Sequence, residues 1–470
     1  MKRNAASGPF TKPSIMTEQL FTLRSWPAAI LHVDGDAFFT SCEEAIHPEL
    51  RGKPLITGGE RGIVACASYA AKRLGVKRGV PLQDARKLCP DLIVLPSDYE
   101  TYSLFSRRMF NVLRRFSPQV EGYSIDEAFV DLTGMRRALH ASYEDIADRV
   151  RREVKGEVGI GVSVGLSVSK VLAKVASKHR KPDGLTIIPG REIARYLEGL
   201  SVEKIWGIGD ATMNYLHKMG VRTALEFAQL SETAVKERFT KPGQEIWREL
   251  RGESVYPVCP EEKSDYASIS KTKTFTPPTS DPQYLFAHLL RNVESACIKA
   301  RRYKLAPRKI IPFLKTQSFD FRAAEAKLCR PCAHPLELSA LLRELFDDLY
   351  RKGILYRATG IVLADLEPDR ETQYSLFEDP LRAERIRQLY EAADEVAGRY
   401  GKHALHLGGS HAIEVRGRGR RGEATVRERT RFRGETRRKH LGLPIFHIPD
   451  PSPSGTRPIR PRRPPEPAED

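Results

Sequence analysis

Residues 119–132 read QVEGYSIDEAFVDL, and this stretch decides the fold of the first part of the chain. The stretch predicts two short strands joined by a turn around Ser124-Ile125-Asp126. The run AAILHV at 28–33 is nearly continuous in apolar residues and predicts a buried strand earlier in the chain. Alternating apolar residues at 158–168 predict a half-buried strand later in the chain.

Two helices lie between these strands. Apolar residues fall at helical spacing over 101–116, and a second helix is expected near 142–154. The resulting order, with an insert after the first strand, is that of the split βαβ, ferredoxin-like unit, in which the third strand lies antiparallel between the first two. We therefore expect Asp34, at the end of the first strand, to meet Asp126 and Glu127 at the turn.

These three carboxylates would repel one another unless a cation neutralised them. Ligands that are all oxygen favour a hard ion, Mg²⁺ or Mn²⁺. Two such ions can stabilise the attacking and leaving oxygens of a phosphoryl transfer. The alternative is a solvated turn beside an aspartate that caps a helix. Asp36 is expected either to cap the helix that starts near Ala37 or to contact the metal.

Composition limits the class of protein. The 470 residues correspond to about three domains, and 40% hydrophobic residues exclude a wholly disordered chain. The formal charge of +17 favours nucleic acid as a partner over an anionic membrane. No apolar run approaches the length of a bilayer span and no secretory signal is visible, so we expect no membrane partner. Seven scattered cysteines fit a reducing compartment, and the expected location is cytoplasmic.

The two ends differ from the middle of the chain. Residues 1–27 are expected to form a flexible lead. Residues 413–470 hold 15 Lys and Arg, 8 Asp and Glu, and nine prolines, so they carry +7 of the charge and are expected to be disordered. This basic tail is either a non-specific nucleic-acid arm or a solvated segment that keeps the protein soluble.

Five stretches together resemble a known family. These are HVDGDAFFTSCEE at 32–44, SYAAKRLGVKRGVP at 68–81, YSIDEAFVDLTG at 123–134, GLSVSKVLAKVASKHRKPDG at 165–184 and IWGIGDATMNYLHKMGV at 205–221. They resemble, in the family's order, the motifs of Y-family (translesion) DNA polymerases, most of all the DinB-like branch of bacterial DNA polymerase IV. The resemblance extends to about residue 411.

The resemblance implies an α+β multidomain fold: a right-hand polymerase with a ferredoxin-like palm, small fingers, a helical thumb with a helix-hairpin-helix, and an α+β little finger. The implied domains are the palm at 28–37 and 98–189, the fingers at 38–97, the thumb at 190–258, a linker at 259–267, the little finger at 268–368, and a clamp-binding segment with a following helix at 369–412.

The implied function is that of an error-prone, template-directed DNA polymerase (a nucleotidyltransferase) in DNA damage tolerance. It would add deoxynucleotides to a primer 3′ end by two-metal phosphoryl transfer. The expected partners are primer–template DNA, deoxynucleoside triphosphates and the sliding clamp (the beta subunit), and we expect a monomer. By resemblance, Asp34, Asp126 and Glu127 are catalytic, and with the backbone carbonyl of Gly35 they hold two Mg²⁺ ions, Mn²⁺ being possible.

The resemblance also implies how the nucleotide is held. The residues that match the triphosphate contacts are Tyr69, Lys72 and Lys181. Lys72 stands where the family usually has Arg, and Arg73 next to it is the alternative contact. Phe39 falls at the position of the steric gate, where a ring beneath the sugar collides with a 2′-hydroxyl. Phe38 is expected to pack inward.

DNA contacts are implied in the thumb and the little finger. Residues 205–221 are expected to form a helix-hairpin-helix, in which Gly207, Ile208 and Gly209 between two helices let backbone N–H groups bind a phosphate. Strand-like runs and helices at 282–300 and 336–352 fill the little finger. Its basic side chains expected to face phosphates are Lys271, Lys273, Arg301, Arg302 and Lys304.

Two short motifs lie towards the C-terminus. The sequence QYSLF at 373–377 resembles the clamp-binding peptide of bacterial polymerases, with Gln373, Leu376 and Phe377 as the clamp contacts. Cys329, Cys332 and His334 have a spacing that suggests zinc. A structural zinc site needs four ligands and no second pair lies close in sequence, so we favour ordinary loop residues.

Two other functions compete with the polymerase. One is a DNA- and clamp-binding scaffold with little turnover, which the retained acids disfavour. The other is a nucleotide cyclase, which shares the palm topology and the paired acids. A helix-hairpin-helix, a clamp peptide and a basic charge balance do not suit a cyclase.

Overall fold

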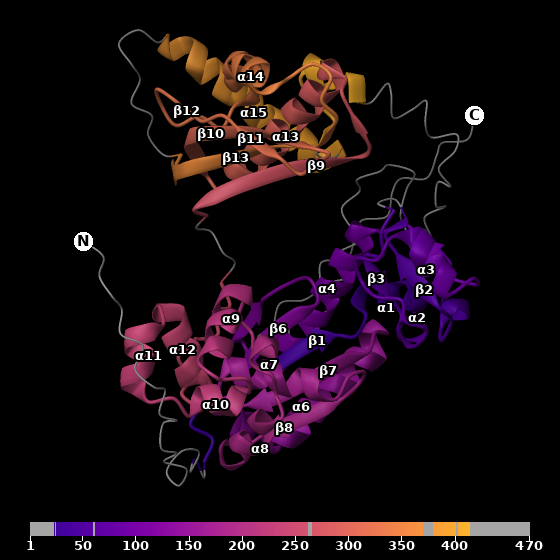
Figure 1. Cartoon of the computed structure of the whole chain (residues 1–470), viewed down its shortest axis with the longest axis vertical. Helices are drawn as coiled ribbons and strands as arrows, with labels where there is room; N and C mark the ends of the chain where they lie inside the picture. The colour runs from indigo at the N-terminus through magenta and orange to yellow at the C-terminus, as the bar shows by residue number, and fades with distance from the viewer. Residues whose placement is uncertain are drawn as a thin grey trace, which may run out of the picture. The chain divides into compact units, whose positions relative to one another are not determined.

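The computed structural model describes most of the chain and divides into two compact units, residues 1–266 and 267–470 (Figure 1). The described residues are 23, 25–59, 62–261, 266–369, 379–400 and 403–413. The clamp-like peptide at 373–377 lies outside them, as do nearly all of the lead and the tail. Among the described helices, none combines the length and the hydropathy that a membrane span requires.

A five-stranded sheet organises the first unit, in the order β5-β6-β1-β7-β8. The strands are β1 (Ile30–Gly35), β5 (Val120–Gly122), β6 (Glu127–Asp131), β7 (Val162–Ser167) and β8 (Leu185–Ile188). As the sequence predicts, β6 lies between β1 and β5 and is antiparallel to both. The edge strand β8, parallel to β7, was not expected.

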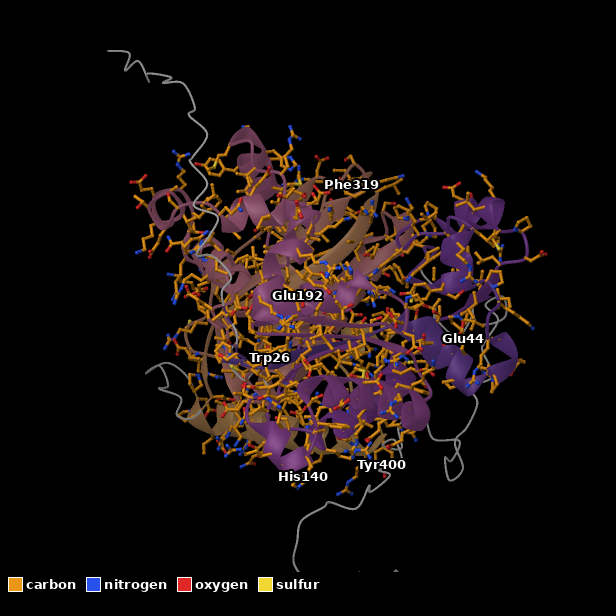
Figure 2. All side chains as sticks on the ribbon, turned by 90° about the horizontal axis from the view of Figure 1, so that it is seen from below. Trp26, Glu44, His140, Glu192, Phe319 and Tyr400 are labelled. Atoms are coloured by element: carbon orange, nitrogen blue, oxygen red, sulfur yellow. The ribbon has the colours of Figure 1, made fainter. Side chains whose placement is uncertain are left out.

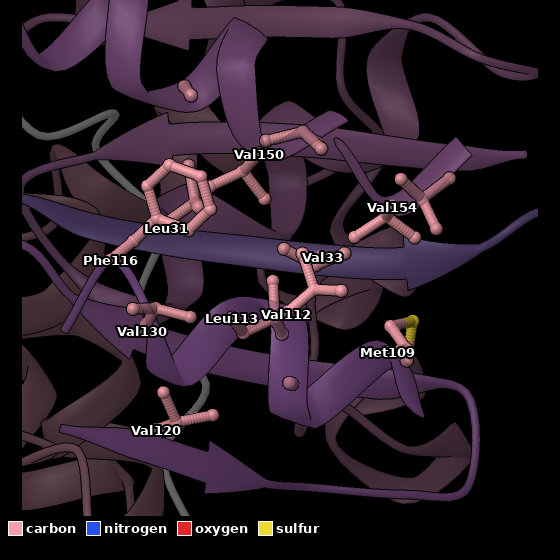
Figure 3. Packing of buried hydrophobic residues seen from close by; sticks show 14 of the residues in the cluster. Leu31, Val33, Met109, Val112, Leu113, Phe116, Val120, Val130, Val150 and Val154 are labelled. Carbon is pink, nitrogen blue, oxygen red and sulfur yellow. The ribbon is translucent and has the colours of Figure 1, made fainter. Parts of the chain in front are cut away.

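Alternate residues of β1 explain why helices cover both faces of this sheet. Leu31 and Val33 belong to one buried cluster with residues of the helices α4 (Tyr99–Arg114) and α6 (Tyr143–Glu153), as Figure 3 shows. Ile30 points to the other face, where it clusters with Ala173 of α7 (Lys170–His179). Because both faces are buried, the strand reads as a continuous apolar run.

The insert after β1 forms a small subdomain with its own core. Its three-stranded sheet has the order β3-β2-β4. The elements are α1 (Phe38–Ile46), η1 (Pro48–Leu50), β2 (Leu55–Thr57), β3 (Cys66–Ala67), α2 (Tyr69–Arg73), α3 (Leu82–Leu88) and β4 (Ile93–Leu95). Buried Ile56, Val64 and Leu92 belong to this core. Two further short elements of the first unit are α5 (Met135–Leu139) and the π-helical η3 (Val154–Val158).

Residues 190–250 form a helical subdomain around Phe227 and Trp247. Its elements are η4 (Gly190–Glu192), α8 (Ile193–Glu198), η5 (Val202–Lys204), α9 (Asp210–Lys218), α10 (Ala224–Ala228), α11 (Glu232–Arg238) and α12 (Lys241–Leu250). The expectation of a helix on both sides of Gly207 is wrong in one respect. The helix α9 follows it, but only the single 3₁₀ turn η5 comes before it; Ser201, just before η5, pairs with Thr223, and Gly207 has φ +91°.

The second unit contains a five-stranded sheet, in which four strands follow the order β11-β10-β13-β9 and β12 pairs with β10. Its strands are β9 (Ser268–Thr279), β10 (Leu305–Thr316), β11 (Phe321–Ala323), β12 (Ala326–Lys327) and β13 (Tyr356–Pro368). Its helices are α13 (Pro282–Arg302), α14 (Pro335–Leu349), α15 (Pro380–Tyr400) and the turn η6 (Gly408–Ser410). The expected helices at 282–300 and 336–352 are confirmed within two or three residues.

Candidate active site

Strand pairing brings the three predicted acids together. Asp34 near the end of β1 lies directly opposite Glu127, the first residue of β6. The turn before Glu127 is fixed to the same strand end, because the Gly35 N–H donates to the Asp126 carbonyl at 2.8 Å. Directly opposed residues of an antiparallel pair place their Cβ atoms about 5 Å apart. Asp34 and Glu127, some ninety residues apart in sequence, therefore lie side by side, as the topology predicts.

Each of these acids has a hydrogen-bond donor. Lys181 Nζ lies 2.5 Å from Asp34 Oδ1, and Lys174 Nζ lies 3.0 Å from Glu127 Oε2. The Ser124 hydroxyl donates to Asp126 Oδ1 at 2.6 Å. Charge-assisted bonds of this kind orient the carboxylate oxygens at the strand ends.

The electrostatic balance of the site still favours another cation. Burial raises the pKa of Asp34 to about 6; Lys181 acts against this rise, and the charges of Glu127 and Asp126 add to it. A divalent ion beside Asp34 would compensate both the burial and the like charges. The donor set is all oxygen, which fits Mg²⁺ or Mn²⁺.

Replacing Asp34 by Asn is expected to raise the free energy of unfolding of the metal-free protein by about 1–3 kcal/mol near neutral pH. The folded pKa of about 6 lies above the unfolded value, so the unfolded state loses its proton first. The contribution of Asp34 to the free energy of unfolding therefore falls as the pH rises from about 4 to about 6. It stays low above about pH 6. Denaturant unfolding of both proteins in chelator measures the difference, which should shrink towards about pH 4. A difference that grows on acidification would contradict this assignment.

Asp36 does not cap a helix, which corrects one of the two sequence expectations. The residue before α1 is Ala37, with φ 45°, and no side chain caps that end. The buried carboxylate of Asp36 instead accepts hydrogen bonds from the Ser163 hydroxyl at 2.9 Å, the Tyr69 hydroxyl at 3.2 Å and the Asp183 N–H at 2.7 Å. It thereby ties β7, α2 and the loop after α7 to the end of β1.

Two of the expected triphosphate contacts, Tyr69 and Lys181, lie beside this carboxylate. Tyr69 begins α2, and Lys72 Nζ lies 4.2 Å from the centroid of the Tyr69 ring. Lys181 Nζ is 3.7 Å from Asp36 Oδ1. Arg73 lines a cavity of about 160 Å³ together with Tyr69 and Glu44, which is labelled in Figure 2. The sequence left open which of Lys72 and Arg73 contacts the triphosphate, and both lie on the same short helix as Tyr69.

Comparisons with known proteins agree with this geometry. Residues 33–178 match the impB/mucB/samB family and residues 266–376 match its C-terminal domain. The DNA polymerase IV of Desulfatibacillum aliphaticivorans is 33% identical over 375 residues, which cover 79% of this chain and 94% of that protein. That of Moorella thermoacetica is 33% identical over 396 residues, covering 83% and 97%. The chain belongs to the DinB-like Y-family DNA polymerases.

Solved structures support the same assignment. A Y-family DNA polymerase chimera of Dbh and Dpo4 superposes with a TM-score of 0.60 at 26% identity, covering 72% of this chain and 99% of the chimera. An insertion ternary complex of Dbh DNA polymerase superposes with a TM-score of 0.50 at 25% identity, covering 72% and 98%. This Y-family polymerase is a DNA-directed DNA polymerase of the translesion type. These comparisons support neither a scaffold with little turnover nor a cyclase.

Two adjacent phenylalanines begin the helix that leaves the acidic strand. Phe38 is buried in the main core, as expected. Phe39 is half-buried, and its ring stacks on Tyr102 with centroids 4.6 Å apart and planes 14° apart. Tyr99 meets the Phe39 ring edge-on, with centroids 5.5 Å apart. In this Y-family polymerase the aromatic stack therefore fixes the orientation of the Phe39 ring.

The segment Gly207-Ile208-Gly209 follows Trp206, which contacts the acidic turn. The Trp206 indole N–H donates to the Tyr123 hydroxyl at 3.0 Å. Lys174 Nζ lies 4.3 Å from the centroid of the Tyr123 ring and 5.3 Å from that of Trp206. Gly209 is the residue before α9, so the backbone N–H groups of the first turn of α9 follow it.

The basic residues of the second unit do not all behave as expected. Lys273, Arg302 and Lys304 are exposed and Lys271 is half-buried. Arg301 does not face solvent: its guanidinium makes two 2.7 Å bonds to the carboxylate of Asp394 and donates to the Ala333 carbonyl. The expectation that Arg301 contacts DNA phosphates is therefore wrong, because α15 packs over it.

Sequence reasoning missed the role of Lys174. Lysines recur every four residues at 170, 174 and 178, which places them on one face of α7. Lys170 Nζ lies 2.7 Å from Glu121 Oε2, one strand away from the site, just as Lys174 pairs with Glu127. The spacing of four was the signal that could have identified this basic face opposite the acidic strand ends.

Proposed function

We propose that Asp34, Asp126 and Glu127, with the backbone carbonyl of Gly35, hold two divalent ions, Mg²⁺ or Mn²⁺, at which this polymerase extends a primer. The observation that carries the proposal is the pairing of Asp34 with Glu127 at adjacent strand ends, with Asp126 in the turn beside them. The oxygen donors and the raised pKa of Asp34 fit such ions. The ions would supply charge stabilisation for the attacking and leaving oxygens. The direct test is nucleotide incorporation by Asp126→Asn and Glu127→Gln variants.

The chain's own residues orient the incoming nucleotide. Lys181, Lys72 and Arg73 offer cations to the triphosphate, and Tyr69 offers a hydroxyl. Fixed donors stabilise charge that develops on phosphoryl oxygens without reorganising during the reaction. Phe39 beneath the sugar excludes a 2′-hydroxyl. The proposed substrates are the deoxynucleoside triphosphate and primer–template DNA, in keeping with the insertion ternary complex solved for Dbh DNA polymerase.

The domain assignment follows from the same proposal. The sheet of the first unit is the ferredoxin-like palm (28–37 and 98–189), the insert 38–97 is the fingers, and 190–258 is the thumb with its phosphate-binding Gly207-Ile208-Gly209. The second unit holds the little finger at 268–368. The boundary between the two units, at residues 266 and 267, falls inside the expected linker at 259–267.

Replacing Asp36 by Asn is expected to raise the KM for the incoming deoxynucleotide by about tenfold or more, with a smaller loss in kcat. The carboxylate positions Tyr69 and the Asp183 backbone beside Lys181, and the amide cannot accept from all three donors. Single-nucleotide insertion kinetics measure the split. Ser163→Ala, which removes one of the three donors, is the milder matched variant. An unchanged KM in Asp36→Asn would contradict this positioning role.

Clamp binding by Gln373, Leu376 and Phe377 stays a prediction, because the peptide lies outside the described residues. The triple alanine variant is expected to lose stimulation by the sliding clamp and to keep its distributive synthesis, since the catalytic motifs end well before the peptide. Primer extension with and without clamp measures both rates. Equal stimulation of the variant and the parent would place the clamp contact elsewhere.

We further propose that the enzyme acts as a monomer in the cytoplasm.

A further inference from the structure

We propose that the second unit binds one Zn²⁺ ion through Cys332 Sγ, His334 Nδ1 and the Glu337 carboxylate. These residues lie in the loop after β12 and in the first turn of α14. Among the described residues they are the one group whose sulfur, nitrogen and carboxylate donor atoms all lie within 4.8 Å of one another. The site is separate from the polymerase chemistry and does not rest on it.

The distances between the donor atoms suit tetrahedral zinc. Cys332 Sγ lies 3.9 Å from His334 Nδ1 and 3.4 Å from a Glu337 oxygen, and His334 Nδ1 lies 3.4 Å from the other Glu337 oxygen. Zinc bonds of about 2.3 Å to sulfur and about 2.0–2.1 Å to nitrogen and oxygen place tetrahedral donors about 3.3–3.6 Å apart. Because the two Glu337 distances involve different oxygens, the carboxylate must turn to present one of them to the ion.

Charge and burial also fit this ion. Cys332 and His334 are buried, so solvent does not compete for most of their surface. A thiolate and a carboxylate together cancel the two charges of Zn²⁺, and the sulfur excludes Mg²⁺ and Ca²⁺ as preferred ions.

The surroundings hold the three ligands in place. The His334 ring stacks on Tyr390 of α15, with ring centroids 5.4 Å apart. The backbone N–H of His334 donates to Cys332 Sγ at 3.4 Å. Arg330 pairs with one Glu337 oxygen, while the other oxygen is buried and lies 3.4 Å from His334 Nδ1. Partners of this kind orient metal ligands. Bound zinc would fasten the loop to α14 beneath α15, with water as the fourth ligand.

Cys329 is not part of the group. Its side chain is exposed, whereas Cys332 is buried among the proposed ligands. The spacing of the two cysteines suggested that both are ligands. The structure instead groups Cys332 with His334 and with Glu337 in the first turn of α14. Cys329 provides the matched control for any test, because it is the same residue type in the same loop.

Elemental analysis of the full-length protein, purified without chelator and desalted, tests the site. We expect one zinc per chain in the parent and in Cys329→Ser, and loss of that zinc in Cys332→Ser and Glu337→Gln. Cobalt substitution of the parent should give a thiolate-to-cobalt charge-transfer band that Cys332→Ser lacks. Because the cobalt band is measured on the parent, misfolding of a variant cannot hide a failure. A parent that binds no zinc and shows no band, or zinc that survives Cys332→Ser, would overturn the proposal.

Discussion

Asp126→Asn and Glu127→Gln are each expected to lower single-nucleotide incorporation by about a thousandfold or more, while primer–template binding changes by no more than a few fold. The amide removes the charge that a divalent ion needs but leaves the turn intact, because the Ser124 bond and the backbone pairing do not depend on that charge. The DNA contacts that we propose lie elsewhere, in the thumb and the little finger. Rapid-quench incorporation and DNA anisotropy on the same preparations measure the two quantities.

Glu121→Gln is the matched control for these variants. Glu121 lies on the neighbouring strand β5 and pairs with Lys170 as Glu127 pairs with Lys174. It lies outside the acidic group at the strand ends, so its loss should affect stability and leave incorporation near that of the parent. Incorporation at the parent rate by either Asp126→Asn or Glu127→Gln would contradict the proposal that these acids hold the metal ions.

Phe39→Ala is expected to let the enzyme insert ribonucleotides, raising their kcat/KM by about a hundredfold relative to deoxynucleotides. Phe39 lies in the first turn of the helix that leaves the acidic strand, and its ring is held against Tyr102. A ring fixed beneath the sugar forces a ribonucleotide out of the in-line position, whereas a methyl group leaves room for the 2′-hydroxyl. Insertion of matched ribo- and deoxynucleotides opposite one template base measures the change.

Phe38→Ala separates this sugar selection from a packing effect. Phe38 is 3% exposed in the main core, so its truncation should cost about 3–5 kcal/mol of unfolding free energy without relaxing sugar choice. If Phe38→Ala is the variant that accepts ribonucleotides, or if Phe39→Ala still rejects them as the parent does, the gate has been assigned to the wrong ring.

The sheet of the first unit could be predicted from sequence because each of its longer strands has a clear apolar pattern. The order of elements then places β6 between β1 and β5, and the convergence of Asp34 with Glu127 follows. The edge strand β8 was missed, since Leu185–Ile188 is too short for its pattern to stand out beside Gly184.

Features that depend on contacts between distant segments could not be predicted. Asp36 looked like a helix cap from its position, and only the fold brings Ser163 and Asp183 to its carboxylate. Arg301 looked like a DNA contact because nothing in the sequence shows that Asp394 packs against it. Glu337 lies close to Cys332 because the helix α14 begins between them. A search of the sequence for paired cysteines does not consider a glutamate in that position.

Manganese binding in the presence of primer–template DNA and a non-hydrolysable deoxynucleotide tests the metal assignment most directly. Electron paramagnetic resonance of free Mn²⁺ counts the bound ions without requiring turnover. The account predicts two bound ions per chain in the parent and in Glu121→Gln, and loss of at least one of them in Asp126→Asn and Glu127→Gln. Equal manganese occupancy in the parent and in both acidic-site variants would contradict it.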